Sequence, residues 1–519
     1  MRRAEDLRVA DVIREHAAER ADRVAVVHED RELTYGALDE RSNRLANALR
    51  ARGVGKGDRV AYLDHTSPEA LELMFAAAKL GAVIVPMNWR LAVPELSAVL
   101  QDCAARVLIA GGAFAQTASE LVVRQPDPPE LIPLANDDVS GYEQQLAAHP
   151  PEDPRHRGAA GEVVVQMYTS GTTGVPKGVL TTHRNLAAAA ETSPHWEFDH
   201  TSVSLTPSPM FHISGIGWAF VGLWNGATTI LVSRFDPATV LDLLERRRVT
   251  NAVFVPTILQ MLSAVPGAAG RDFSALRSIA YGGSPITTPV LKAALRTFRC
   301  SLFGIYGLTE TTGAITQLDP ADHEPDGPRE RLLRSVGRPY PWVELRIADP
   351  GTGAPRAPHD VGEVWLRAPN VTPGYFHRPA ETAAALTGDG WLRTGDGGYL
   401  DADGYLFLTD RIKDMIVSGG ENVYPIEVEE ALAQHSGVDQ VGVIGVPDER
   451  WGEMVTALIV PRPDAEITPE ELIAFARERL AGYKLPRRIE FVSDLPRTPT
   501  GKVLKHELRA RYAQATATG

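Results

Sequence analysis

The chain has 519 residues, of which 44% are hydrophobic and 23% are charged, so its composition is that of an ordinary globular protein of two to four domains. The formal net charge of −13 argues against general affinity for nucleic acid, although local lysines and backbone amides can still bind an anionic ligand. No apolar run approaches the roughly 18 residues of a membrane-spanning helix, and no apolar signal-peptide core follows the first residues, so we expect a cytoplasmic protein. Cys103 and Cys300 have no partner at metal-ligand spacing, and we expect two buried thiols.

The first 160 residues alternate between helical and strand patterns. Residues 38–49 and 68–80 have helical patterns, the second ending at Gly81, whereas residues 57–63 and 82–86 read as strands. Such alternation predicts a parallel sheet covered by helices on both faces. Residues 124–160, rich in Pro, Asp and Gly, are expected to be an irregular surface excursion.

The alternation continues to about residue 320, after which the pattern changes. The strands expected in this part are residues 162–167, 229–232, 252–255 and 278–281, and a turn follows the last of them at 282–285. Residues 320–334 are expected to form a loop. Short strands and turns over residues 336–409 then predict a small β-rich lobe.

The last hundred residues form a separate pattern of two strands and two helices. The strands are residues 440–446 and 455–460. One helix is predicted to begin at Pro425, with proline at the first helical position, and the other at a capping box of Thr468 and Glu471. The sequence therefore predicts an α/β fold followed by a compact α+β unit.

A polar, glycine-rich segment follows the strand at 162–167: Tyr168-Thr169-Ser170-Gly171-Thr172-Thr173-Gly174-Val175-Pro176-Lys177-Gly178. Glycines let backbone N–H groups approach a ligand closely, and hydroxyls and a lysine add donors and charge, a combination that suits a polyphosphate. It is not the usual P-loop, because Pro176 and Gly178 replace a glycine and a hydroxyl of that pattern. The alternative is a surface linker, although linkers rarely follow a buried strand so tightly.

This segment resembles the signature of the adenylate-forming enzymes, which include acyl-CoA synthetases, aryl-CoA ligases, luciferases and adenylation domains. Further motifs follow in that family's order: Tyr306-Gly307-Leu308-Thr309-Glu310, Thr394-Gly395-Asp396, Asp410-Arg411-Ile412-Lys413-Asp414, Gly419-Gly420-Glu421-Asn422-Val423-Tyr424-Pro425 and Pro499-Thr500-Gly501-Lys502. The resemblance covers nearly the whole chain. It is greatest to bacterial medium- or long-chain acyl-CoA synthetases.

The resemblance implies a two-step reaction with ATP, Mg²⁺ and CoA. A carboxylate attacks the α-phosphate of ATP and expels pyrophosphate, and a thiol then displaces AMP from the acyl-adenylate. Because the protein supplies no covalent help in the first step, its contribution is positioning and charge neutralisation.

The roles of the nucleotide-site residues follow from the resemblance alone. Glu310 and Thr169 would serve the metal, and Tyr306 would stack on adenine. Asp396 would accept from the ribose hydroxyls, with Arg411 beside it. The other residues expected to bind the cofactors are Ser170, Gly171, Thr172, Thr173, Gly174, Lys177, Gly283, Ser284, Pro285, Gly307 and Thr309. Three alternatives stay open: Glu310 as a solvated turn glutamate, Tyr306 as a core tyrosine and Thr-Gly-Asp as a simple turn.

By the same resemblance, a small mobile C-terminal domain completes the site. Lys502 would bridge the carboxylate and the α-phosphate, unless it is one lysine in a basic tail. Lys413 would be the hinge, and Gly419 and Gly420 would let the pantetheine arm of CoA pass. The expected boundaries are 1–409 for the large domain, 410–413 for the hinge and 414–519 for the small domain.

The segment Pro209-Met210-Phe211-His212-Ile213-Ser214-Gly215 resembles the acid-pocket segment of acyl- and aryl-CoA ligases. His212 stands where adenylation domains for α-amino acids carry an aspartate, which argues against an α-amino acid, and we place it with Lys502, Thr169 and Glu310 among the catalytic candidates. A packed core histidine is the alternative. Trp218 could stack on an aromatic acid or belong to the core.

Together these features predict an acid:CoA ligase acting on a fatty or other hydrophobic acid. The alternative is a free-standing enzyme that activates an aryl or specialised acid and passes it to a carrier protein or another nucleophile. A non-catalytic relative is disfavoured because Lys502, Glu310 and Asp396 are all present. The expected partners are the acid, ATP and CoA, without nucleic acid. The acid's identity, the oligomeric state (a homodimer included) and a peripheral membrane contact stay open.

Overall fold

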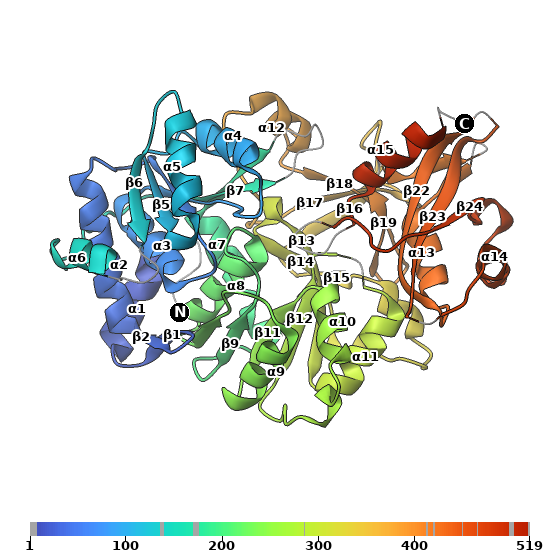
Figure 1. The fold of residues 1–519 in the computed structure, drawn as a ribbon, viewed down its shortest axis with the longest axis horizontal. Coiled ribbons are helices and arrows are strands. Elements are labelled where there is room, and N and C mark those ends of the chain that lie inside the picture. Colours follow the sequence, from blue (N-terminus) through green and yellow to red (C-terminus); the bar gives the residue numbers. More distant parts are fainter. Residues whose placement is uncertain are drawn as a thin grey trace.

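The structure, a computed structural model, describes residues 8–134, 140–169, 176–284, 286–411, 414–418, 421–448, 450–463, 465–497 and 503–516. Four sheets organise these residues. Three sheets with their helices form what we call the N-terminal body, and the fourth belongs to the C-terminal domain at one end of the molecule (Figure 1). No helix in the described ranges is both long and apolar enough to cross a bilayer.

The first sheet has six strands in the order β6-β5-β3-β4-β7-β8 and is parallel except for β8. Its strands are β3 (Arg59–Leu63), β4 (Val83–Pro86), β5 (Val107–Gly111), β6 (Glu130–Leu134), β7 (Val163–Thr169) and β8 (Lys177–Thr182). Helices α4 (Val93–Cys103) and α5 (Ala115–Arg124) cover one face. The predicted strands at 57–63, 82–86 and 162–167 are confirmed.

The expectation of an irregular excursion at 124–160 is wrong in part. It contains β6, which pairs in parallel with β5, and the helix α6 (Ser140–Ala147). Tyr142 of this helix is buried and donates to Glu72 at 2.9 Å. The prolines and aspartates of residues 124–160 obscured the short strand β6. This strand forms because it pairs with β5, and its own sequence has no clear strand periodicity.

The second sheet has nine strands in the order β15-β14-β13-β12-β11-β9-β10-β1-β2. They are β1 (Val24–His28), β2 (Arg31–Thr34), β9 (Val203–Thr206), β10 (Thr228–Leu231), β11 (Asn251–Phe254), β12 (Ser278–Gly282), β13 (Ser301–Leu308), β14 (Gly313–Leu318) and β15 (Arg338–Pro339). The run from β1 to β13 is parallel, and β2, β14 and β15 are antiparallel at the edges. Parallel strands need helical crossovers, which explains the alternating pattern in the sequence.

Helices cover the outer face of this second sheet and fill the space between the two sheets. The outer helices are α9 (Pro237–Arg246), α10 (Pro256–Ala264) and α11 (Thr288–Phe298), and their apolar residues form one core with the sheet. The inner helices are α1 (Val9–Arg20), α2 (Tyr35–Ala51), α3 (Pro68–Leu80), α7 (His183–Ala190) and α8 (Ile213–Trp224). The predicted helix at 68–80 is confirmed, and Gly81 ends it with a φ of 73°.

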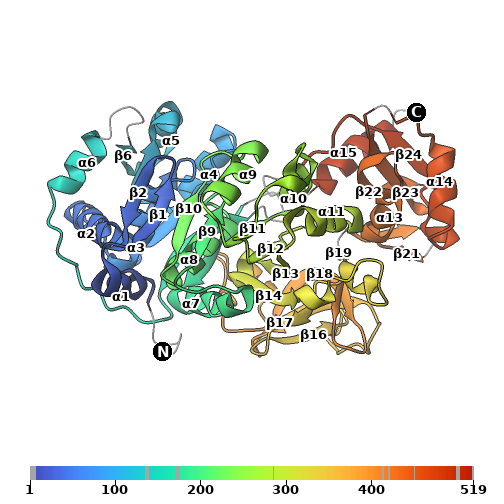
Figure 2. The same cartoon turned by 90° about the horizontal axis from the view of Figure 1, so that it is seen from below.

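The third sheet is the predicted β-rich lobe. Its strands run antiparallel in the order β16-β17-β18-β19 and are β16 (Glu344–Ala348), β17 (Gly362–Arg367), β18 (Leu392–Leu400) and β19 (Leu406–Arg411); α12 (Pro379–Ala385) lies beside them. In both views this lobe lies next to β13 and β14 (Figures 1 and 2). Several short 3₁₀ helices complete the body: η2 (Gly112–Phe114), η3 (Ser193–Trp196), η4 (Ala268–Gly270), η5 (Thr309–Thr311), η6 (Pro320–Asp322) and η7 (Glu330–Arg334).

The C-terminal domain is built on a five-stranded sheet. Its strands are β20 (Ile416–Ser418), β21 (Glu421–Val423), β22 (Val438–Asp448), β23 (Gly452–Pro461) and β24 (Arg488–Phe491), and its helices are α13 (Pro425–Ala433), α14 (Pro469–Arg477), η9 (Gly482–Lys484) and α15 (Lys505–Thr516). Pro425 begins α13 and Thr468 caps α14, as predicted. The side chain of Glu471 does not complete the capping box and instead lies 3.5 Å from His435. The predicted α/β plus α+β fold class is confirmed.

Both cysteines are free thiols, as expected. Cys103 is fully buried on α4, and Cys300 is partly buried just before β13. Burial raises the pKa of each thiol to about 12, so neither is a reactive thiolate at neutral pH.

Candidate active site

The polar, glycine-rich segment connects two antiparallel strands. β7 ends at Thr169 and β8 begins at Lys177, and these two residues are paired across the ladder. Ser170, Gly171, Thr172, Thr173 and Gly174 lie outside the described residues. The paired residues Thr169 and Lys177 therefore fix where the segment leaves the sheet and where it returns.

Tyr306 and Asp396 lie 90 residues apart in sequence and meet in the structure. The Tyr306 hydroxyl on β13 donates to Oδ2 of Asp396 on β18 at 2.7 Å, and the two residues are only 7% and 9% exposed. A hydrogen bond to a carboxylate in such a buried place is strong and fixes the orientation of both groups. Asp396 is also paired with Arg411 across β18 and β19, which brings together the two residues expected at the ribose. The side chain of Arg411 lies outside the described atoms.

Glu310 stands on η5, directly after β13. Its carboxylate oxygen Oε1 accepts a hydrogen bond from the Tyr375 hydroxyl at 2.9 Å, and η5 packs against β8. The turn is tight, because a Cβ on Gly307 would lie 1.9 Å from the carbonyl oxygen of Gly313. Only glycine fits there, which explains the glycine in Tyr306-Gly307-Leu308-Thr309-Glu310. Glu310 is thus a held carboxylate and not a freely solvated one.

The segment expected beside adenine follows β12. A Cβ on Gly282 would lie 2.2 Å from the carbonyl oxygen of Ile305, and Gly283 has a φ of +83°, so both positions require glycine. Ser284 follows and is half-buried, whereas Pro285 lies outside the described residues. Close packing of β12 against β13 thus brings this turn beside the strand that carries Tyr306.

His212 is the N-cap residue of α8, and aromatic rings extend from it. Its ring centroid is 4.5 Å from that of Phe211, which is 6.1 Å from that of Trp89; Trp89 in turn is 4.7 Å from His65. Burial, with Arg234 and Arg90 nearby, lowers the pKa of His65, so this ring is neutral at pH 7. The row is an aromatic surface at the carboxyl ends of β3, β4 and β9, and the guanidinium of Arg90 lies 4.8 Å from the ring centroid of Trp89.

Trp218 belongs to the core. It is 4% exposed and packs against Trp196 and Phe198, each with ring centroids 5.2 Å away. The interpretation of Trp218 as a core residue is therefore favoured over stacking on a substrate.

The remaining candidates are in the expected hinge and the C-terminal domain and lie outside the described residues. These are Lys413, Gly419, Gly420 and Lys502. Their neighbours are described: β20 and β21 pair with Ser418 opposite Glu421, and Arg497 forms a β-bridge with Val503.

The residues expected at the metal site suit Mg²⁺ that binds together with the phosphates of ATP. No group of three or more His, Cys, Asp or Glu side chains able to hold a metal ion occurs within the described ranges. Mg²⁺ needs no such cage, because it is commonly bound by one or two carboxylates together with substrate phosphates. Glu310 offers one carboxylate of that kind, and the Thr169 hydroxyl at the end of β7 is a further oxygen donor.

Sequence reasoning missed Tyr375. No catalytic motif contains it, and it lies 65 residues from Glu310, to which it donates. The only sequence feature that could have pointed to Tyr375 was the pair Gly374-Tyr375, a glycine followed by an aromatic residue in a segment with few strand patterns. That signal is not distinguishable from an ordinary loop without the structure.

Comparison with known proteins agrees with this geometry. Residues 13–376 match the AMP-binding enzyme family, and residues 427–502 match the AMP-binding enzyme C-terminal domain. The chain is 41% identical to the fatty acid–[acyl-carrier-protein] ligase ScoC of Streptomyces coeruleorubidus, over 96% of this chain and 95% of that protein. It is 40% identical to a feruloyl-CoA synthase of an Amycolatopsis species, over 94% and 96% of the two chains. The ATP-bound crystal structure of MatB from Rhodopseudomonas palustris superposes with a TM-score of 0.90 at 30% identity, covering 98% of this chain and 100% of that one.

The chain therefore belongs to the adenylate-forming superfamily of AMP-binding enzymes. Within it, the chain falls among the ATP-dependent, AMP-forming acid:CoA ligases, whose substrates are a carboxylic acid and ATP.

Proposed function

We propose that this enzyme joins a hydrophobic carboxylic acid to CoA through an acyl-adenylate. The observation that carries the proposal is the hydrogen bond between Tyr306 and Asp396, with Glu310 on the turn that follows Tyr306. It joins the groups assigned to adenine and ribose in one buried pair, and the half-buried residue assigned to the metal follows on the same chain segment. Such an arrangement would hold ATP in one orientation.

The first step is attack of a carboxylate oxygen on the α-phosphorus, with cleavage of its bond to pyrophosphate. In this proposal the loop from Thr169 to Gly174 and Lys177 hold the β- and γ-phosphates, and Lys502 neutralises charge between the carboxylate and the α-phosphate. Bound Mg²⁺, held by Glu310 and Thr169, would supply further charge neutralisation on the phosphates. Tyr306 and the Gly283–Pro285 turn would face adenine, and Asp396 with Arg411 the ribose.

The second step is attack of the CoA thiolate on the acyl carbon, with AMP as leaving group. We assign residues 1–409 to the large domain, 410–413 to the hinge and 414–519 to the small domain. Rotation about Lys413 would withdraw Lys502 and bring Gly419 and Gly420 to the acyl-adenylate. The family match supports this division, because it ends at residue 376 for the large part and resumes at residue 427.

The aromatic row beside His212 supports a hydrophobic acid, and His212 in place of an aspartate argues against an α-amino acid. Phe211, Trp89 and the neutral His65 present apolar ring surface, and burial of such surface contributes about 25 cal/mol per Å². Fatty and aryl acids both satisfy this requirement.

A second acceptor is supported by the relative ScoC, whose name states that its acceptor is an acyl carrier protein. CoA and a carrier protein present the same phosphopantetheine thiol. Under this alternative, the adenylation step is unchanged and only the donor of the thiol differs.

A pyrophosphate-release screen tests the proposal. Fatty acids of graded length, cinnamic-type and other aryl acids, and α-amino acids are supplied with Mg²⁺-ATP, without an acceptor, with CoA, or with a phosphopantetheinylated carrier protein. We expect turnover with hydrophobic acids and CoA, and none with α-amino acids. Turnover only with the carrier protein supports the second acceptor, and the absence of acid-dependent pyrophosphate release contradicts the function itself.

A further inference from the structure

A segment outside the recognised motifs connects the phosphate-binding strands to Glu310. Residues 372–378, which we call the strap, run beside β8: Leu180 N donates to the Gly374 carbonyl at 3.1 Å, and Phe376 N donates to the Gly178 carbonyl at 2.8 Å. At the start of the strap, Thr372 N donates to the backbone carbonyl of Glu310 at 2.8 Å. The strap therefore joins β8 and η5 through backbone bonds.

The side chain of Tyr375 lies between two groups of opposite charge. Its hydroxyl donates to Oε1 of Glu310 at 2.9 Å, and its ring centroid lies 5.4 Å from Nζ of Lys177. The hydrogen bond fixes the rotamer of the carboxylate, and the ring face attracts the ammonium. Gly374 has a φ of +143°, a conformation open almost only to glycine, which allows the strap to turn the ring this way.

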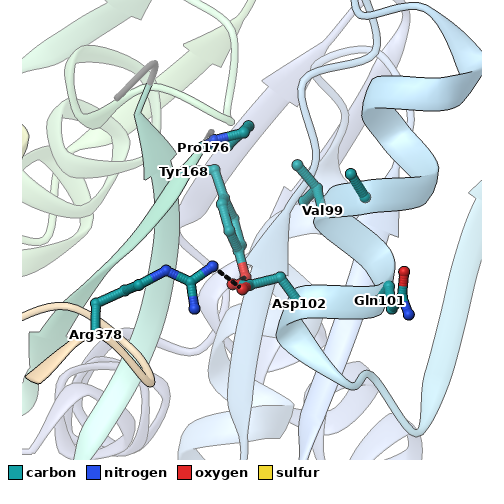
Figure 3. Close-up of a pocket in the computed structure, with 7 residues that line it drawn as sticks. Val99, Gln101, Asp102, Tyr168, Pro176 and Arg378 are labelled. Carbon is teal, nitrogen blue, oxygen red and sulfur yellow. Dashed lines mark hydrogen bonds and ion pairs between the residues drawn. The ribbon is translucent and has the colours of Figure 1, made fainter. Parts of the chain in front are cut away.

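The far end of the strap is anchored to the other strand of the phosphate loop. Arg378 donates to Oδ1 of Asp102 on α4 at 2.6 Å, and the Tyr168 hydroxyl donates to Oδ2 of the same carboxylate at 2.6 Å (Figure 3). Burial raises the pKa of Tyr168, so it stays a protonated donor. These three side chains, with Pro176, line a hollow of about 260 Å³. Tyr168 precedes Thr169, so Asp102 and Arg378 anchor the strap to the strand that leads into the loop.

We propose that Tyr375 is a positioning residue of the metal–phosphate site. It holds the carboxylate of Glu310 and the ammonium of Lys177 in a fixed relation, so that both meet the phosphates of Mg²⁺-ATP without reorganisation. Preorganised charge of this kind is worth more than the same charge on a mobile side chain. The inference rests on the proposed function, because it takes Glu310 as the metal carboxylate.

The test is Tyr375→Phe, which removes only the hydroxyl. Two quantities are measured against free Mg²⁺: the affinity for ATP by calorimetry without acid, and the acid-dependent ATP–pyrophosphate exchange rate. We expect the half-saturating Mg²⁺ concentration to rise roughly 10-fold in both, the effect of losing a hydrogen bond to a charged group. The matched control is Tyr405→Phe, whose hydroxyl donates to the Asp322 carboxylate at 3.0 Å, and it should leave the Mg²⁺ dependence unchanged.

Three outcomes separate the possibilities. If the wild-type chain binds Mg²⁺-ATP and Tyr375→Phe has the same Mg²⁺ dependence, the positioning role is wrong while the proposed function stands. A wild-type chain without Mg²⁺-dependent ATP binding contradicts the proposed function itself. In the Glu310→Gln background, Tyr375→Phe should add less than about a 2-fold effect; a fully additive loss would assign Tyr375 to general stability. All comparisons are made below the lowest melting temperature of the set.

Discussion

The N-terminal body holds its candidate site residues in a hydrogen-bonded framework, whereas the C-terminal domain, whose candidates lie outside the described residues, docks against that body. In the body, Tyr306, Asp396 and Glu310 stand on paired strands or on the turn directly after one, and hydrogen bonds link them to each other or to the strap. The C-terminal domain meets the body partly through a helix end: Oε1 of Glu430 on α13 accepts from the Thr288 hydroxyl at 2.8 Å, where α11 begins. α13 also packs against β19.

We attribute this difference to two tasks, holding the nucleotide and moving groups into and out of the site. Under the proposed function, groups that hold the adenosine moiety would serve both half-reactions and gain from rigidity, because each ångström of misplacement costs rate. The groups proposed on the small domain would serve one half-reaction each, so they would have to be delivered and withdrawn. A strand ladder suits the first task, and a docking contact of a few hydrogen bonds suits the second.

The largest effect is expected for Lys502→Ala. Loss of this ammonium removes charge neutralisation that serves only the first transition state, so acyl-adenylate formation should fall by at least roughly 10²–10³-fold. Transfer of a supplied acyl-adenylate to CoA should survive. The control is Lys505→Ala, whose ammonium pairs with Glu429 at 2.9 Å. Equal loss in both half-reactions would mean that Lys502 is structural or shared.

The second largest effect is expected for Glu310→Gln, which should change the Mg²⁺ dependence of the N-terminal body. A neutral amide is a poorer ligand for a hard cation, so the Mg²⁺ needed for half-maximal adenylation should rise roughly 10–100-fold with the fold intact. The check is a Mg²⁺ titration alongside a circular dichroism melt. Normal activity at limiting Mg²⁺ would refute the assignment of Glu310.

Lys413→Pro tests whether the two regions move relative to one another. A hinge must change its backbone angles, and proline fixes φ near about −65°. Pyrophosphate release should survive, while thioester formation should fall steeply. Both half-reactions are measured on one preparation, and a proline variant that makes acyl-CoA at the normal rate would show that the hinge is elsewhere.

The smallest effect is expected for Glu430→Ala. Burial raises the pKa of Glu430, and removing its bond to Thr288 should weaken docking by about 0.5–1.5 kcal/mol, which is roughly a 2- to 10-fold change in the docking equilibrium. The half-reaction that uses this docked arrangement should slow by that factor, and the other half-reaction should not. Glu427→Ala is the control, because Glu427 pairs with Lys484 inside the domain at 2.7 Å. An effect of the same size for both variants would indicate general destabilisation.

The sequence predicted what local patterns encode. Apolar runs and glycine stops located the parallel strands and α3, and ordered motifs identified the adenylate-forming fold. It could not predict the bond between Tyr306 and Asp396, since two sheets must pack before those residues meet. Tyr375 was missed for the same reason: its role depends on the strap lying beside β8. The strand β6 was missed because it owes its form to pairing with β5, and Trp218 needed the packing of Trp196 and Phe198 to be placed in the core.

An oxygen-transfer experiment tests the central claim, that the acid is activated by adenylation, most directly. An acid that the enzyme uses as a substrate, with both carboxylate oxygens replaced by ¹⁸O, is incubated with ATP, Mg²⁺ and CoA. The ¹⁸O content of AMP, phosphate and pyrophosphate is then measured by mass spectrometry. If the carboxylate attacks the α-phosphorus and the thiol then attacks the acyl carbon, one ¹⁸O atom appears in AMP for each thioester formed. Label in inorganic phosphate or pyrophosphate, or AMP without label, would contradict the account.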